Sequence, residues 1–156
     1  MLKERIESEM RQAIRSGDEL RLSVLRLLLA AVHNREIEKR TKSGEAKGAT
    51  LTDEEVLGAV RSELKKRLDA VAAYEAGQRP EAAARERAEA DILNAFLPAE
   101  LSDQELEALV GTGMAATGAS SREHFGKLMG WMMGQVKGRA LGDRVAEAVR
   151  RKLSSQ

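Results

Sequence analysis

The sequence contains no cysteine, and its 156 residues include only two prolines, one Trp, one Tyr and two Phe. Without cysteine, disulfide bonds, thiolate-held metal ions and cysteine nucleophiles are all excluded. No stretch alternates Val, Ile, Thr or Tyr with polar residues, as a half-buried strand does. Ala, Leu, Glu, Arg and Lys dominate instead, and these are the strongest helix formers. The sequence therefore predicts an all-α fold.

Long apolar runs are also missing. Hydrophobic residues make up 42% of the chain and charged residues 33%, a composition too apolar for a disordered protein and too charged for a membrane span. The first residues, Met1 to Glu7, carry charges of both signs and lack the apolar centre of a signal peptide. We therefore expect a cytoplasmic protein that has no membrane partner.

Recognisable catalytic motifs are absent as well. The two histidines, His33 and His124, lie far apart in the sequence, and there is neither a nucleophile elbow nor a strand followed by a Gly-rich phosphate loop. The carboxylates are numerous, but many have a Lys or Arg three or four residues away, which is typical of solvated helix faces. We expect no cofactor and no metal ion, and the residues predict no autonomous active site.

Apolar residues at helical spacing, separated by turn residues, predict seven helices. They span residues 2–16, 19–40, 53–76, 81–97, 103–116, 121–134 and 142–153. The sequences from Thr52 to Glu55 and from Ser102 to Glu105 are typical of capping boxes. Residues 41–50, with two glycines and little to bury, predict a mobile loop. Pro98 divides the prediction into an N-terminal domain of about four helices, residues 1–98, and a three-helix C-terminal domain, residues 99–156.

The charges are unevenly distributed along the chain. Residues 1–50 carry a net charge of +3, residues 51–98 carry −3 and residues 120–156 carry +5. A basic C-terminal segment is compatible with a polyanionic partner, and equally with solvated helix faces whose charges happen to be uneven.

Three stretches stand out by residue type and spacing, and each has a structural reading beside a functional one. In residues 21–29 two arginines lie within a Leu-rich helix, where their stems can pack while their charged ends reach solvent. Residues 65–67 are three consecutive cations, which spread around a helix and form no single patch. Residues 125–140 contain glycines at every fourth position, which allow close approach of another backbone. Lys137, Gly138 and Arg139 follow, and their cations suit either the C-terminal dipole of the helix or a contact with a backbone phosphate.

Taken in order, these stretches resemble the YqeY family over essentially the whole chain. The matching pieces are Leu20–Arg26, Thr52–Val56, Lys65–Arg67, Tyr74 with Gly77 and Arg79, Phe96–Pro98 before Leu101 and Ser102, Gly126 and Lys127 with Met129 and Gly130, and Lys137–Ala140. The resemblance implies an N-terminal helical domain joined to a small three-helix domain. The region after Pro98 is similar to the tail of the tRNA-dependent amidotransferase B subunit, which binds tRNA while other domains perform the chemistry.

The resemblance leaves three functional hypotheses open. The first is an accessory module that binds tRNA weakly, through backbone and shape, beside an amidotransferase or a synthetase. The second is a helical protein-interaction module, because the three-helix tail is also similar to ubiquitin-associated domains. The third is a component that acts in trans within an amidotransferase. The family label of carbon–nitrogen ligase with glutamine as amide donor belongs, on this reading, to the larger enzyme.

For the first hypothesis, cations and a flexible glycine near the C-terminal end form the candidate site. The residues expected to contact nucleic acid are Lys127, Lys137, Gly138, Arg139 and Arg144. Arg150, Arg151 and Lys152 are further cations of the same domain. Phe125 and Trp131 are expected in the core, so the sequence predicts no aromatic platform for stacking bases.

We predict that the purified protein neither hydrolyses glutamine nor forms a covalent adduct with a glutamine analogue, because it has no cysteine and no recognisable serine nucleophile. Ammonia release and intact-mass spectrometry measure the two reactions. Glutamine turnover that survives extensive purification and disappears on mutation of one residue of this chain would contradict the prediction.

Overall fold

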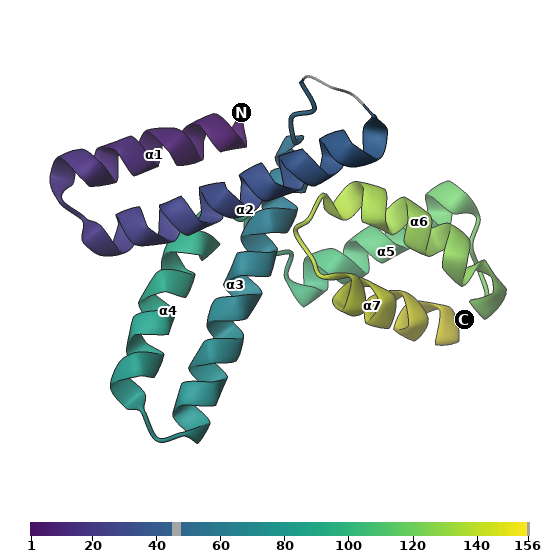
Figure 1. Ribbon diagram of the computed structural model, residues 1–156. Coiled ribbons are helices and arrows are strands. Elements are labelled where there is room, and N and C mark those ends of the chain that lie inside the picture. Colours follow the sequence, from purple (N-terminus) through teal and green to yellow (C-terminus); the bar gives the residue numbers. More distant parts are fainter. Residues whose placement is uncertain (45–47, 156) are drawn as a thin grey trace. The chain divides into compact units, whose positions relative to one another are not determined.

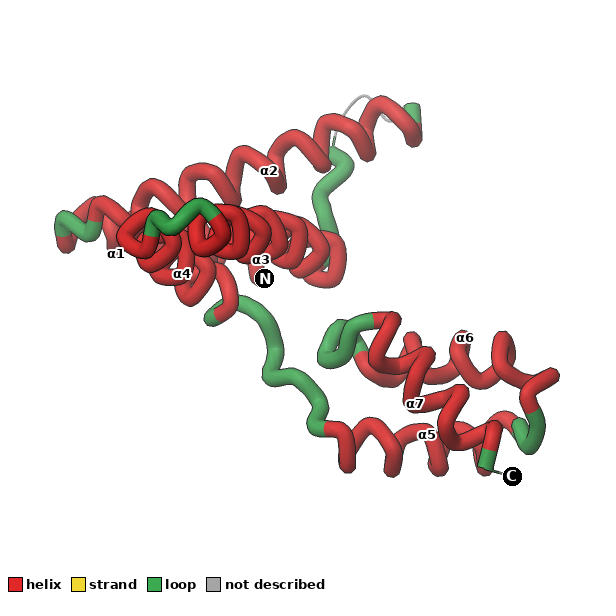
Figure 2. Tube along the Cα trace, turned by 90° about the horizontal axis from the view of Figure 1, so that it is seen from below, coloured by secondary structure: helices red, strands yellow, loops and turns green. Residues whose placement is uncertain are grey.

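The computed structural model describes residues 1–44 and 48–155, and all regular structure in them is helical. They form seven α-helices and one short 3₁₀-helix and contain no strand (Figure 2), which confirms the all-α prediction. None of the helices in this part of the chain is long and apolar enough to cross a membrane. The chain divides into two compact units, Met1–Leu97 (unit 1) and Pro98–Gln156 (unit 2).

Unit 1 consists of two helical hairpins (Figure 1). Its helices are α1 (Leu2–Ser16), α2 (Glu19–Ser43), α3 (Asp53–Ala76) and α4 (Pro80–Asn94). The α1–α2 and α3–α4 hairpins share one apolar core, to which all four helices contribute. Its fully buried side chains include Ile6, Leu25, Leu28, Val56 and Leu93. Because α2 packs against α1, α3 and α4, its Leu-rich sequence is buried on more than one side.

The first turn of unit 1 has the geometry that its sequence predicts. Gly17 adopts a left-handed conformation with φ of 71°, and the Asp18 N–H donates to the Ala13 carbonyl, which is the bond of a Schellman motif. The Asp18 carboxylate then accepts from the Arg21 N–H and caps α2. Asp18 thus closes the C-terminal turn of α1 through its N–H and caps the N-terminus of α2 through its carboxylate.

Two predicted boundaries in unit 1 are wrong by three residues. Helix α2 continues to Ser43, so the first three residues of the predicted 41–50 loop are helical, and residues 45–47 of that loop lie outside the described residues. Helix α4 ends at Asn94, three residues before the predicted end, and residues 95–97 form a turn ahead of Pro98.

The turn between α3 and α4 places its left-handed residue where the sequence does not suggest it. Gly77 has an ordinary φ of −82°, whereas Gln78 has φ of +55°. The Arg79 N–H donates to the Tyr74 carbonyl at 2.8 Å, so Gln78 occupies the position of a Schellman motif that glycine usually fills. A non-glycine residue is strained at this φ.

Unit 2 consists of α5 (Asp103–Thr117), the 3₁₀-helix η1 (Arg122–His124), α6 (Phe125–Val136) and α7 (Gly142–Ser154). The predicted helix over 121–134 is therefore a 3₁₀ turn followed by an α-helix that ends two residues later. The three α-helices contact one another and enclose a separate apolar core. Fully buried members of this core are Val110, Leu128, Met132, Val136, Val145 and Val149.

Small residues of α5 and α6 have different roles. A methyl group at Gly113, on α5, would lie 2.7 Å from the Trp131 ring and 2.8 Å from Leu128, so glycine is required for α6 to approach this closely. By contrast, Gly126, Gly130 and Gly134 are exposed, and a methyl group on any of them would meet nothing within 4 Å. The expected close approach of another backbone to that face does not occur among the described residues.

We predict that Gln78→Gly stabilises the protein by roughly 0.5–1 kcal/mol, because relief of the left-handed strain exceeds the extra chain entropy that glycine has when unfolded. Urea denaturation followed by circular dichroism measures the change. Gly77→Ala is the matched control, since its φ of −82° suits any residue. A lower stability of Gln78→Gly than of the parent would show that the strain is absent.

Candidate nucleic-acid interface

The structure separates the predicted site residues between the two ends of α6. Lys127 lies in the first turn of this helix, whereas Lys137 follows its last residue. The helix has 12 residues, which corresponds to a length of about 18 Å. Lys137, Gly138 and Arg139 therefore form one group, and Lys127 lies about one helix length away from it.

The segment from Lys137 to Arg139 is held against the start of unit 2. Lys137 and Gly138 both have positive φ, 46° and 75°, and they reverse the chain after α6. The Arg139 N–H donates to the Val136 carbonyl at 2.8 Å, and the Arg139 carbonyl accepts from the Leu101 N–H at 2.7 Å. The Arg139 side chain also donates from Nε to the Ala99 carbonyl at 3.0 Å. The backbone of this turn is thus fixed from both sides.

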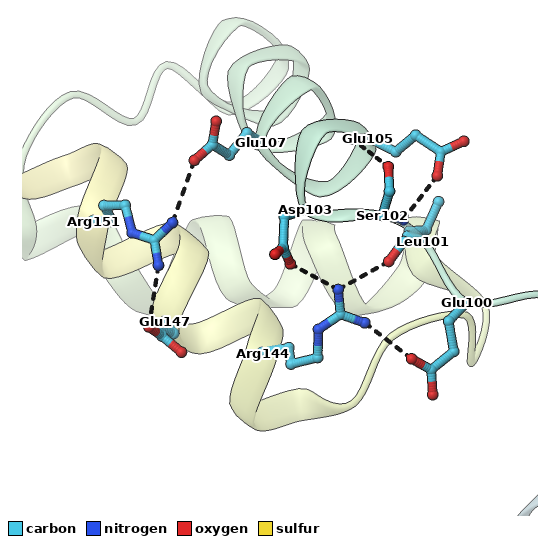
Figure 3. Close-up of polar contacts among 9 residues, drawn as sticks. All are labelled: Glu100, Leu101, Ser102, Asp103, Glu105, Glu107, Arg144, Glu147 and Arg151. Carbon is cyan, nitrogen blue, oxygen red and sulfur yellow. Dashed lines mark hydrogen bonds and ion pairs between the residues drawn. The ribbon is translucent and has the colours of Figure 1, made fainter.

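Arg144, in the first turn of α7, is engaged inside unit 2 (Figure 3). Its guanidinium donates to the Asp103 carboxylate and to the Leu101 carbonyl, each at 2.9 Å, and to the Glu100 carboxylate at 3.1 Å. The hydrogen bond to Asp103 is the main reason that the pKa of Arg144 lies above its usual value. These contacts connect the start of α5 to α7, so the side chain has a structural task.

The acidic start of α5 also meets a second arginine of α7. Arg151 donates to Glu107 at 3.3 Å and to Glu147 at 3.1 Å (Figure 3). Next to these pairs, the Ser102–Glu105 capping box forms as predicted, and its backbone hydrogen bond lowers the pKa of Glu105. Unit 2 as a whole holds eight basic and seven acidic residues, so the basic excess of residues 120–156 is largely balanced by α5 and the segment before it.

Six cations of unit 2 make no ion pair with any residue that the structure describes. They are Arg122, Lys127, Lys137, Arg139, Arg150 and Lys152. Arg122, in η1, is the one that is not among the cations predicted from the sequence. Its lack of a carboxylate partner follows only from the three-dimensional arrangement.

The stretches in unit 1 are used for packing. Arg21 forms an ion pair with Glu9 of α1, which agrees with the structural reading of that stretch, while Arg26 is exposed. Lys65 and Lys66 are exposed, but Arg67 is mostly buried, 3.6 Å from Glu86 and 3.4 Å from Glu89 of α4. The reading of residues 65–67 as a solvated face is therefore wrong for Arg67.

Metal chemistry receives no support from the described part of the chain. Residues 1–44 and 48–155 contain no group of three or more His, Asp or Glu side chains arranged to hold a metal ion. The His124 imidazole instead accepts backbone N–H groups of Ser120 and Ser121 at Nδ1, at 3.1 and 3.3 Å, and so caps the start of η1. The other histidine, His33, is exposed and lies 3.9 Å from Glu36.

Comparison with known proteins gives a family. The model of the family described as Yqey-like protein matches residues 3–153, which is nearly the whole chain. No curated protein matches the sequence.

We predict that Arg144→Gln lowers the urea midpoint of unfolding more than Arg151→Gln does. Arg144 is 32% exposed and binds a backbone carbonyl as well as two carboxylates, whereas Arg151 is 60% exposed and binds carboxylates, so solvent screens its pairs more strongly. Urea denaturation of both variants, followed by circular dichroism, is measured at low and at high salt. The difference between their midpoints should become smaller at high salt but should not disappear. Equal midpoints would show that Arg144 has no special structural task.

Proposed function

The chain belongs to the YqeY family, and from this membership we propose that it is an accessory module that binds tRNA and has no active site of its own. The proposal rests on the similarity of the region after Pro98 to the tRNA-binding tail of the amidotransferase B subunit. We place the protein in the cytoplasm, beside aminoacyl-tRNA amidation or another process that handles tRNA.

We further propose that the two units are separate domains, residues 1–98 and 99–156, of four and three α-helices. In support, each unit has its own apolar core, and the division between the units falls between Leu97 and Pro98. On this proposal the N-terminal domain is a scaffold or a partner surface, and the C-terminal domain contacts the RNA.

The observation that carries the RNA proposal is the fixed turn from Lys137 to Arg139. Lys137 has no ion-pair partner among the described residues, and Arg139 uses Nε for Ala99 while forming no ion pair. Gly138 has no side chain to keep a phosphate from the backbone. Cations on a rigid turn recognise phosphates without reading bases, which suits folded RNA, whose phosphates and 2′-hydroxyls are accessible.

The predicted site residues then take different roles. Lys137 and Arg139 bind phosphates and Gly138 allows their approach. Lys127 adds a phosphate contact at the other end of α6, and Arg144 positions the turn through Leu101, whose N–H binds the Arg139 carbonyl. This division explains how an arginine that is bound to carboxylates can still serve the interface.

The protein-interaction alternative depends on exposed apolar side chains of α6. Clustered exposed methionines over residues 129–133 would favour it, but Met132 is fully buried and Met129 is partly buried, while Met133 is 45% exposed. One exposed methionine is not a groove for a partner helix. The trans-acting role in an amidotransferase is supported only by the family label.

We predict that Lys137→Glu combined with Arg139→Glu abolishes tRNA binding while helicity remains, and that parent binding falls steeply with added salt. Filter binding of a folded tRNA transcript measures the affinity, and circular dichroism measures helicity. Because Arg139→Glu also removes the bond to Ala99, Lys137→Glu alone is tested as well and should weaken binding and reduce the salt slope by about one.

The matched control is Arg11→Glu with Lys65→Glu, two exposed cations of unit 1 whose replacement changes the net charge equally. It should retain most of the affinity. Equal binding by the Lys137 variants and the parent would overturn the site. Absence of tRNA binding by the parent at low salt would overturn the function and favour a protein partner.

A further inference from the structure

A pocket of about 310 Å³ lies at the end of unit 2 that is remote from Lys137. It is lined by Arg122, Phe125, Arg150, Leu153 and Ser154, which come from η1, the start of α6 and the last turns of α7. Helix α7 contacts both α6 and η1, and Figure 1 shows α7 beside α6. Leu153 is buried in the core of the unit, so the pocket has a firm apolar base.

Phe125 is only partly core. Its ring packs against the core of unit 2, as the sequence predicts, but it is half-buried and also lines the pocket. The Arg150 guanidinium lies over the ring, 5.1 Å from its centroid, in a cation–π contact that fixes the charged plane at the pocket wall. The pocket therefore presents an aromatic ring and a guanidinium plane together, which the sequence analysis did not expect.

No ion pair among the described residues compensates the charge of the pocket. Neither Arg122 nor Arg150 forms an ion pair within the described part of the chain, although Arg151, the next residue of α7, is bound to Glu107 and Glu147. Glu123, beside Arg122, makes no ion pair with either arginine. Two arginines left without carboxylates at a small pocket favour an anion.

The ligand that uses all of these features is both planar and anionic. Inorganic phosphate would satisfy the arginines but leave the ring unused, and an uncharged aromatic compound would leave the arginines unused. We propose that this pocket binds one unstacked nucleotide of the RNA partner, with its base against Phe125 and Arg150 and its phosphate at Arg122. This inference rests on the proposed RNA-binding function, and it adds a base-stacking site to the phosphate-binding turn.

The experiment compares full-length variants on three probes: a folded tRNA transcript, a four-nucleotide unstructured RNA, and an RNA duplex without unpaired residues. Phe125→Leu keeps apolar bulk for the core and removes the stacking surface, and Arg150→Gln removes the charge. Arg151→Gln is the matched control one residue along α7. Circular dichroism melting of each variant confirms that it is folded.

We expect Phe125→Leu to weaken binding of the tRNA and the tetranucleotide roughly tenfold, with an unchanged salt slope because the ring contacts no phosphate. Arg150→Gln should weaken binding of the same two probes, and Arg122→Gln, which removes the phosphate contact, should weaken binding and reduce the salt slope. Binding of the duplex should not change with Phe125→Leu, and Arg151→Gln should resemble the parent. Ultraviolet crosslinking with peptide mapping should join an unpaired nucleotide of the tRNA to the peptide that contains Phe125.

The contrary outcomes separate the two proposals. If Phe125→Leu binds tRNA as tightly as the parent does, the nucleotide pocket is overturned and the proposed RNA-binding function is retained. Failure of the parent to bind both the tRNA and the tetranucleotide overturns both proposals. If the parent binds an acidic peptide and not RNA, and Arg150→Gln loses this binding, the pocket belongs to a protein partner. The proposal that it binds a nucleotide is then overturned as well.

Discussion

The docking of the acidic start of α5 against α7 determines which cations of unit 2 are available to a ligand. Asp103, in the first turn of α5, accepts from Arg144 of α7, and a carboxylate at this position is also favoured by the dipole of its own helix. Glu107, one turn later, accepts from Arg151. Arg144 and Arg151 are thus neutralised, and the other cations of unit 2 form no ion pair with any described residue.

Unit 1 uses its charges in another way. Its buried carboxylates, Glu36, Glu63 and Glu89, are each 5–9% exposed and each lies next to a cation. Lys3 of α1 donates to both oxygens of Glu36 on α2, at 2.8 and 2.9 Å. A buried carboxylate without a partner is strongly destabilising, so the pairs of Glu36 with Lys3 and of Glu89 with Arg67, which join different helices, fix how those helices align more than they add stability. Lys3 and Arg67 are therefore occupied by contacts between helices, whereas Lys66 is exposed and pairs with Glu63 within α3.

Sequence reasoning recovered the helices because each has a local signal: capping boxes at Thr52 and Ser102, glycine at Gly17 and proline at Pro80. It failed where tertiary contacts decide. Gln78 takes the left-handed position beside an available glycine, and Arg67 is buried by α4, which nothing within residues 65–67 indicates. The site was predictable as a set of cations, but the distinction between paired and unpaired cations depends on α5 and α7, whose paired residues are about 40 positions apart.

The close contact of Gly113 with Trp131 has a consequence for how this protein can be observed. Trp131 is the only tryptophan of the chain, and its ring is pressed against the backbone of α5 within unit 2. Its fluorescence therefore reports the packing of α5 against α6, whereas circular dichroism sums the helices of both units. If the two signals change at different denaturant concentrations, the chain does not unfold in a single step. A single indole in one half of the chain is thus a built-in reporter of whether the halves are coupled.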